Sequence, residues 1–309
     1  MRKVFTIGET VFDIILKNGK IQTGKAGGSM LNSSVSLGRL GIDVSFISEI
    51  GADEVGNLIN KFLVENHVST SFISRFDDGK TPIALAFLDE NQNAAYSFYK
   101  IYPDKRLQQP FPEITSNDIV LFGSFFSISP QVRQTLIGFI KKASDLGAII
   151  LYDPNIRKPH RNEIPNLQNL IFENISFSDI IRGSDEDFKT IFGVNTFQEA
   201  AEITKNYGNP ILIYTAGGEN VQLQADKETG YFSVPDIKPR STIGAGDNFN
   251  AGIIYALLRQ NIFKNDLKSL EKNQWREIVN AGISLSQEVC KSYNNYISTS
   301  FAKRFLKRK

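Results

Sequence analysis

The sequence is poor in the residues that build disulfides and metal centres. Its 309 residues include one cysteine, Cys290, and two histidines, His67 and His160. A single cysteine excludes an intramolecular disulfide, and two histidines leave too little for a zinc or multi-histidine metal site. Any general base is therefore expected to be a carboxylate.

Net charge and long apolar runs are also scarce. Lys+Arg number 35 against 33 for Asp+Glu, so the formal net charge is +2. This balance gives no broad positive field for nucleic acid and no attraction to anionic membranes. No apolar run reaches membrane-spanning length, and Glu9 and Asp13 interrupt the apolar N-terminus, which excludes a typical signal peptide. We expect a cytoplasmic protein whose partners are small molecules.

Short apolar runs alternate with stretches of helical spacing, which is typical of parallel strands joined by helices in an α/β protein. These runs are Val4–Ile7, Val44–Ile47, Ile119–Phe122, Ala148–Tyr152 and Ile211–Tyr214. Ligands collect beyond the carboxyl ends of such strands. The residues that follow them are suited to a polar ligand: Gly8-Glu9, Gly123-Ser124, Asp153-Pro154-Asn155 and Thr215-Ala216-Gly217-Gly218.

Two β-rich runs, Thr81–Leu88 and Ala94–Tyr99, break this rhythm and predict a hairpin. Ile14–Ile21, interrupted by Asn18-Gly19, supplies further strand candidates. We interpret residues of about 12–24 and 81–101 as a small β lid inserted into a single domain spanning 1–309. The alternative is an edge extension of the main sheet.

The segment Ser241–Gly252 indicates an anion site. Apolar residues at intervals of four from Phe249 predict a helix from Asp247 onward, started by the turn Gly244-Ala245-Gly246. Small residues there let backbone N–H groups converge where the helix dipole favours negative charge, as in a phosphate pocket. Asp247 at its mouth is either a base that accepts a proton during phosphoryl transfer or a helix cap.

The sequence does not match either of two common nucleotide-binding motifs. The run Gly19–Ala26 has P-loop glycine spacing, but Ala26 stands where a hydroxyl must reach magnesium, so we interpret the run as a turn. Gly244-x-Gly246 lacks the third glycine of a dinucleotide fingerprint because Phe249 occupies that place. A nicotinamide dehydrogenase is disfavoured.

With these residues in view, the sequence resembles the PfkB (ribokinase-like) family of sugar and nucleoside kinases over essentially its whole length, and fructokinases most. Ser241-Thr-Ile-Gly-Ala-Gly-Asp247 matches the family's C-terminal signature, and Gly27-Gly28-Ser-Met-Leu-Asn32 through Gly41 its N-terminal one. The resemblance implies an αβα sandwich with a mostly parallel central sheet and a β lid. It also implies Asp247 as catalytic base and the amides around Gly244, Ala245 and Gly246 as anion hole.

The sugar side of the expected site combines flexible backbone with polar side chains. Gly27 and Gly28 allow close approach, and Asn32 offers an acceptor and two donors for vicinal hydroxyls, although a glycine turn before a helix is the plainer interpretation. The resemblance assigns Asp13 to sugar hydroxyls. It also aligns Lys100 with a lid arginine, whose planar fork lysine lacks.

The nucleotide side rests mainly on the resemblance. Asp153-Pro-Asn155-Ile-Arg157 matches an Asp-Pro-Asn-x-Arg run, which would place Asp153 and Asn155 near the triphosphate and its magnesium waters, with Arg157 neutralising charge beside the substrates. The alternative is a turn with a surface ion pair. The remaining residues assigned to the nucleotide by resemblance are Thr215, Gly217, Gly218 and Asn280.

Two positions depart from the family pattern. Where the family carries Asn-x-x-Glu, this chain has Ser184-Asp-Glu-Asp187. Asp187 would then hold magnesium through water, with a side chain shorter than the glutamate of the family. The alternative is that this acidic run is part of the protein surface. Ser241 replaces an aspartate that serves a monovalent-cation site in many members. We therefore doubt a monovalent-cation requirement and expect activity to depend little on potassium.

These observations favour an ATP- and Mg²⁺-dependent sugar kinase, with fructose as the expected acceptor. The alternatives are a ketodeoxygluconate, ribose or nucleoside kinase on the same fold, and a catalytically silent sugar-binding protein. An exposed lid sheet suggests pairing of two copies in a homodimer.

Overall fold

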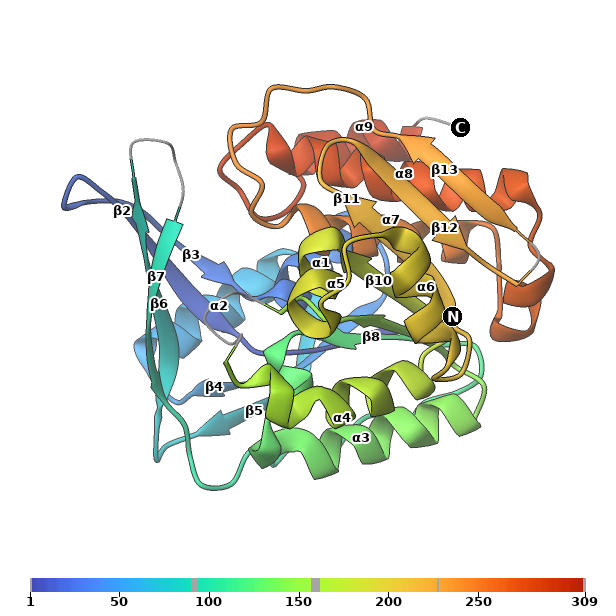
Figure 1. Ribbon diagram of the computed structural model, residues 1–309. Helices are drawn as coiled ribbons and strands as arrows, with labels where there is room; N and C mark the ends of the chain where they lie inside the picture. Colours follow the sequence, from blue (N-terminus) through green and yellow to red (C-terminus); the bar gives the residue numbers. More distant parts are fainter. Residues whose placement is uncertain (1, 90–93, 157–161, 227, 308–309) are drawn as a thin grey trace.

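The computed structural model describes residues 2–89, 94–156, 162–226 and 228–307. Within them, nine strands form one large sheet, which Figure 1 shows at the centre of the molecule. In spatial order these strands are β13 (Thr229–Ser233), β12 (Asn220–Gln224), β11 (Ile211–Ala216), β10 (Ile180–Ser184), β9 (Ile149–Asp153), β8 (Ile119–Gly123), β1 (Val4–Ile7), β4 (Val44–Gly51) and β5 (Val68–Phe76).

The strands from β11 to β5 run parallel, and β12 and β13 add an antiparallel edge. From β1 the chain continues to β4 and β5 on one side, then crosses to β8 on the other. The carboxyl ends of β1 and β8 therefore form the point where the winding reverses, which is where open α/β sheets bind ligands.

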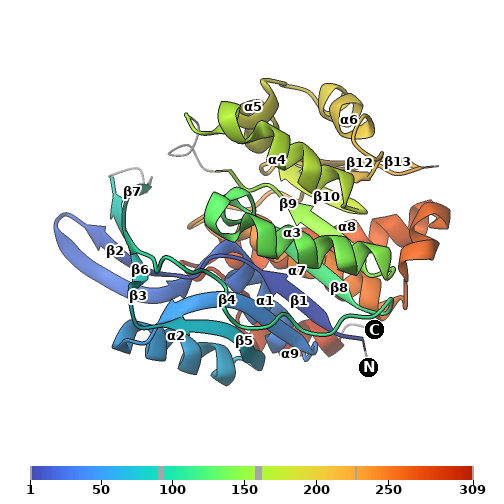
Figure 2. The same ribbon diagram turned by 90° about the horizontal axis from the view of Figure 1, so that it is seen from below.

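Helices cover both faces of this sheet, in the layers that Figure 2 shows from below. Successive residues of a strand point to opposite faces of the sheet, where they pack into two apolar cores. Val4 belongs to one core and Phe5 to the other. The first core is covered by α1 (Ser29–Arg39), α2 (Glu54–Glu65), α7 (Ala245–Arg259), α8 (Lys272–Cys290) and α9 (Thr299–Lys307). The second is covered by α3 (Pro130–Asp145), α4 (Ile164–Ser176), α5 (Asp185–Phe192) and α6 (Phe197–Lys205).

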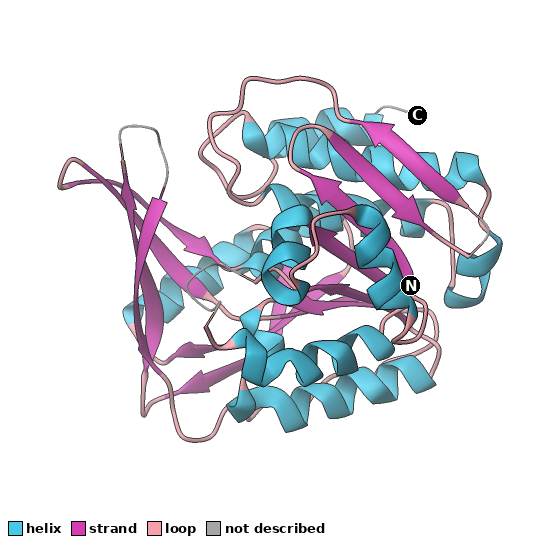
Figure 3. Cartoon of the chain, in the orientation of Figure 1, coloured by secondary structure: helices cyan, strands magenta, loops and turns pink. Residues whose placement is uncertain are grey.

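A second sheet stands beside the first, at the left in Figure 3. Its order is β3 (Lys20–Gly27), β2 (Val11–Lys17), β6 (Lys80–Leu88) and β7 (Ala94–Ile101). The predicted hairpin is present, since β6 and β7 pair antiparallel. The alternative of an edge extension is wrong, because these strands form a sheet of their own.

Two local predictions need correction. Most of the run Gly19–Ala26 lies in strand β3 rather than in a turn. The turn is confined to Asn18 and Gly19, which take positive φ angles of 52° and 72° and join β2 to β3. Helix α7 begins at Ala245, two residues before the expected Asp247, because Gly244 alone reverses the chain as N-cap with a φ of 82°.

Candidate active site

A cavity opens where the winding of the main sheet reverses. Three of its walls come from the residues that follow β1, β8 and β9, as expected from the carboxyl ends of parallel strands. The second sheet and the start of α1 complete it. Its lining residues are Glu9, Val11, Asp13, Gly28, Ser29, Asn32, Phe98, Lys100, Ser124, Phe125, Asn155, Ile243 and Asn295.

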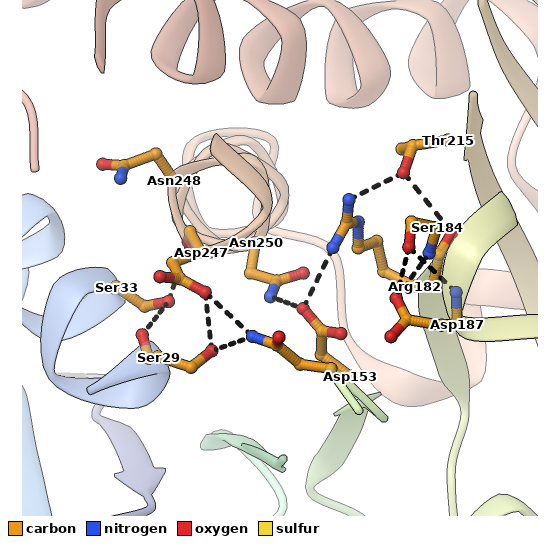
Figure 4. Close-up of polar contacts among 12 residues, drawn as sticks. Ser29, Ser33, Asp153, Arg182, Ser184, Asp187, Thr215, Asp247, Asn248 and Asn250 are labelled. Carbon is orange, nitrogen blue, oxygen red and sulfur yellow. Dashed lines mark hydrogen bonds and ion pairs between the residues drawn. The ribbon is translucent and has the colours of Figure 1, made fainter. Parts of the chain in front are cut away.

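The carboxylate of Asp247 is hydrogen-bonded to side chains that line this cavity, and Figure 4 shows its contact with Ser29. Its Oδ1 accepts hydrogen bonds from Ser29 Oγ at 2.6 Å and Asn155 Nδ2 at 3.2 Å. Its Oδ2 accepts from Asn32 Nδ2 at 2.8 Å. The side chain is only 3% exposed, yet all three donors line the cavity. A bound hydroxyl that displaces one of them would meet the carboxylate itself.

Helix α1 supplies three of the side chains that donate hydrogen bonds to Asp247. Ser29 and Asn32, three residues apart, lie on the same face of the helix, and Ser33 Oγ donates to the Asp247 carbonyl at 2.7 Å. Asn32 uses its amide nitrogen on Asp247, so its buried Oδ1 is left without a hydrogen-bond partner among the described residues. An acceptor buried in this way calls for a donor such as a sugar hydroxyl.

The two glycines of the first signature and Asp13 lie together. Gly28 lines the cavity with Asp13, and the Asp13 carboxylate occupies the place where a Cβ of Gly27 would lie. Residue 27 can therefore carry no side chain while Asp13 keeps this position.

The turn before α7 leaves no room for a side chain at residues 244 and 246. A Cβ on Gly244 would lie 2.6 Å from the Asn295 carbonyl oxygen, and a Cβ on Gly246 would collide with the Arg182 guanidinium. The N–H of Ala245 donates to the Thr242 carbonyl at 3.2 Å. The first-turn N–H groups of a helix have no intrahelical acceptor, so those that follow Ala245 and the positive helix dipole are the groups available to an anion.

Beneath that turn lies a buried ion pair that the sequence did not reveal. Arg182, from β10, donates to Asp153 Oδ2 at 3.2 Å and to Thr215 Oγ1 at 2.6 Å, and Asn250 Nδ2 donates to the same Asp153 oxygen at 2.6 Å. Asp153 is fully buried at the end of β9. Burial raises the pKa of its carboxyl to about 6, while the Arg182 charge opposes the rise and the charge of Asp187 adds to it.

The alternative of a surface ion pair at Asp153 is therefore wrong, because the charge lies inside the protein. Asp153 Oδ1 has no hydrogen-bond partner among the described residues. Arg157 falls outside those residues.

Asp187 and Ser184 form the start of α5. The Ser184 hydroxyl and amide both donate to Asp187 Oδ2, at 2.6 and 2.9 Å, and the Ile156 amide donates to Oδ1 at 2.9 Å. This capping box ties the loop after β9 to α5. Asp187 is buried, so it is not part of an acidic surface, whereas Asp185 and Glu186 are exposed.

The remaining predicted residues are more open. Gly217 and Gly218 form the exposed turn between β11 and β12, and nothing lies within 4 Å of a Cβ placed on either. Asn280 is exposed on α8. Within the described part of the chain, no group of three or more His, Cys, Asp and Glu residues is arranged to hold a metal, and no helix there is long and apolar enough to cross a membrane.

The sequence assigns no role to Ser29, although its spacing to Asn32 on one helix indicates a shared target. The sequence places Glu9 after the first predicted strand, and the family resemblance places Lys100 in the lid, but neither predicts that the two residues meet. They form an ion pair at the cavity wall, with 2.8 Å between Lys100 Nζ and Glu9 Oε1.

The comparisons with known proteins identify the family. The model of the pfkB family of carbohydrate kinases matches residues 1–300, so the chain belongs to this family. It is accordingly a phosphotransferase with an alcohol group as acceptor, built on the ribokinase-like fold.

Relatives and solved structures lie at low identity. Aminoimidazole riboside kinase of Salmonella typhimurium is 22% identical over 270 residues, covering 86% of this chain and 84% of that protein. Fructokinase of Vibrio alginolyticus is 21% identical over 277 residues, covering 89% and 90%. The structure of fructokinase with bound ATP from Xylella fastidiosa superposes with a TM-score of 0.82 at 18% identity, covering 98% of each chain.

Proposed function

We propose that this kinase transfers the γ-phosphate of ATP to a hydroxyl of a monosaccharide, with fructose as the acceptor. One observation carries the proposal: the Asp247 carboxylate, at the start of a helix preceded by an anion-binding turn, is hydrogen-bonded by three side chains that line a polar cavity. The fructokinases among the relatives support the choice of acceptor.

In the proposed reaction, Asp13 and the unpartnered Oδ1 of Asn32 receive hydrogen bonds from sugar hydroxyls. Asp247 takes the proton of the reacting hydroxyl as its oxygen attacks the γ-phosphorus. The bond from phosphorus to the β–γ bridging oxygen breaks, and ADP leaves. The amides around Gly244, Ala245 and Gly246 stabilise the charge on the transferred group.

The ends of β9, β10 and β11 are the proposed nucleotide side, with Asn155, Ser184, Thr215, Gly217, Gly218 and Asn280 as candidate contacts. The unpartnered, buried Oδ1 of Asp153 fits Mg²⁺, since carboxylate oxygen is a ligand that this ion prefers, directly or through water. Asp153 would hold the ion, with Asp187 assisting through water. Bound Mg²⁺ supplies positive charge that neutralises the phosphates.

We also propose that the second sheet is a lid whose closure excludes water and suppresses ATP hydrolysis. Its outer side chains suit a homodimer, because large apolar residues are exposed on strands β3, β6 and β7. These are Ile21, Phe87, Tyr99 and Ile101. Sedimentation of the purified protein at several concentrations tests the dimer, and a monomer throughout contradicts it.

The function is tested by measuring ADP release and product formation with ATP, Mg²⁺ and a panel of acceptors. The panel comprises fructose, ribose, ketodeoxygluconate, adenosine and aminoimidazole riboside. We expect the highest kcat/KM with fructose. Turnover of another acceptor alone would move the assignment to that kinase. Calorimetric binding of a sugar without turnover in the presence of ATP would instead indicate a silent sugar-binding protein.

A further inference from the structure

The cavity wall contains an ion pair that the phosphoryl-transfer chemistry does not use. Glu9 follows β1, and Lys100 lies near the end of β7 in the second sheet. Lys100 Nζ lies 2.8 and 2.9 Å from the two carboxylate oxygens of Glu9. The Tyr102 hydroxyl donates to Glu9 Oε1 as well. Both side chains of the pair are about three-quarters buried, at 24% and 28% exposed.

The Glu9 carboxylate also affects the protonation of Tyr102. The pKa of Tyr102 lies far above its usual value because the hydroxyl is desolvated and lies beside the charged Glu9. Tyr102 therefore stays a hydrogen-bond donor at any physiological pH. With Tyr102 and Lys100 both donating to it, Glu9 is held against the cavity in one position.

This pairing determines the charge that a ligand meets. Lys100 is the one cationic side chain among the described residues that line the cavity, and Glu9 neutralises it. Asp13 adds a second carboxylate to the wall, and Asp247 is hydrogen-bonded to side chains that line it. Lys25 is the cation that faces Asp13 from the neighbouring strand β3. Since Lys100 and Lys25 each face a carboxylate, the described lining offers an anionic acceptor no unpaired cation.

The polar atoms of the wall point to the same ligand chemistry. The side-chain oxygens Oδ1 of Asn32 and Asn295 are buried and have no hydrogen-bond partner in the described part of the chain, and both residues line the cavity. Oxygen acceptors of this kind require donors. Hydroxyl groups supply donors, whereas carboxylate and phosphate groups supply further acceptors.

We propose that Glu9 is a specificity-determining residue: by neutralising Lys100, it makes the cavity select uncharged, hydroxyl-rich acceptors and reject sugar acids and sugar phosphates. The inference rests on the proposed function of the same cavity. It assigns to Glu9 a role distinct from that of Asp247, since Glu9 acts on the choice of acceptor and Asp247 on the transfer. A purely structural Glu9–Lys100 pair, holding the second sheet to β1, would affect all acceptors alike.

The test compares the wild-type protein with Glu9→Gln, which keeps the size of the side chain and removes its charge. kcat/KM is measured with fructose and ribose as neutral acceptors and with ketodeoxygluconate and gluconate, which keep their terminal hydroxyl, as anionic ones. We expect the wild type to favour the neutral group by about 100-fold, and Glu9→Gln to narrow this ratio at least about tenfold, mainly through a lower KM for the anions. Lys100→Met, which leaves Glu9 uncompensated, should widen the ratio.

Two results would overturn the inference: equal use of neutral and anionic acceptors by the wild type, or an equal loss for every acceptor in Glu9→Gln. Thermal unfolding of each variant identifies a failure to fold, in which case the opposite shift expected for Lys100→Met decides the matter. If the wild type transfers phosphate to no acceptor, the proposed function fails. The same charge preference is then measured separately as a ratio of calorimetric Kd values.

Discussion

Replacing Arg182 by methionine removes the one guanidinium that contacts the buried carboxylate of Asp153 among the described residues. Methionine fills much of the same space and leaves Asp153 with Asn250 as its donor. Because the buried carboxyl then loses the charge that faces it, we expect the free energy of unfolding to fall, by about 3–5 kcal/mol once the carboxyl is ionised.

The stability of the wild-type protein depends on pH because the Asp153 carboxyl titrates. Asp153 has a folded-state pKa of about 6 against its usual value of 3.8. A raised carboxyl pKa means that this group favours folding below about pH 4 and that its contribution is lost as the pH rises through 6. At 1.36 kcal/mol for each pKa unit, this interval corresponds to about 3 kcal/mol.

Without the Arg182 charge, which lowers this pKa, the carboxyl titrates at a still higher pH. The stability gap between wild type and Arg182→Met should therefore widen by up to about 1.4 kcal/mol for each pH unit above 6, until the new pKa is reached. Urea unfolding measured between about pH 5 and about pH 8 determines the gap.

The double variant Arg182→Met/Asp153→Asn provides the control, since it removes both charges and the pH dependence with them. It should also be more stable than the sum of the single losses indicates. A gap that stays constant over the whole pH range would refute the reasoning, because Arg182 would then contribute packing alone.

The remaining predictions concern the anion turn, the sugar side and the cation requirement. Gly246→Ala places a methyl group against the Arg182 guanidinium and should lower kcat with little change in the KM for sugar. The matched control Gly138→Ala lies in open space on α3 and should raise the free energy of unfolding by up to about 1 kcal/mol. Equal kcat values for Gly246→Ala and the wild type would contradict the role of the anion turn. Gly27→Ala should raise the KM for sugar by displacing the Asp13 carboxylate, and an unchanged KM would remove Asp13 from the sugar site. Activity in K⁺ and in Na⁺ at matched ionic strength should be nearly equal, since Ser241 presents a neutral hydroxyl that accepts from the Ile243 amide, and strong activation by K⁺ would count against this.

The alternation of apolar runs and helical spacing was enough to predict the parallel sheet and five of its strands. Strand β10 was missed because its centre carries Arg182, and a charged residue breaks the apolar pattern on which the prediction depends. The structure explains the exception: this arginine is buried because Asp153 and Thr215 bind it. The charged residue that breaks the apolar pattern of β10 is therefore a residue of the candidate site.

Motif reasoning located Asp13, Asn32, Asp153 and Asp247 but not the contacts between them. The donors that surround Asp247 come from α1 and from the loop after β9, at sequence separations of 218, 215 and 92 residues. Local spacing carries no information about pairs so distant. The Glu9–Lys100 pair, 91 residues apart, was out of reach for the same reason.

The most direct test of the account is the rate of phosphoryl transfer by Asp247→Asn, measured with the affinities for sugar and ATP. Asparagine has nearly the same shape, and its one side-chain oxygen can still accept where Ser29 and Asn155 donate to Oδ1. Its NH2 group then takes the place of Oδ2, where the Asn32 amide can turn its unpartnered oxygen to accept from it, so the fold should be retained. The account predicts that kcat falls by about 10²–10⁴-fold while both Kd values change little. A variant that keeps the wild-type kcat would contradict the assignment of Asp247 as the base.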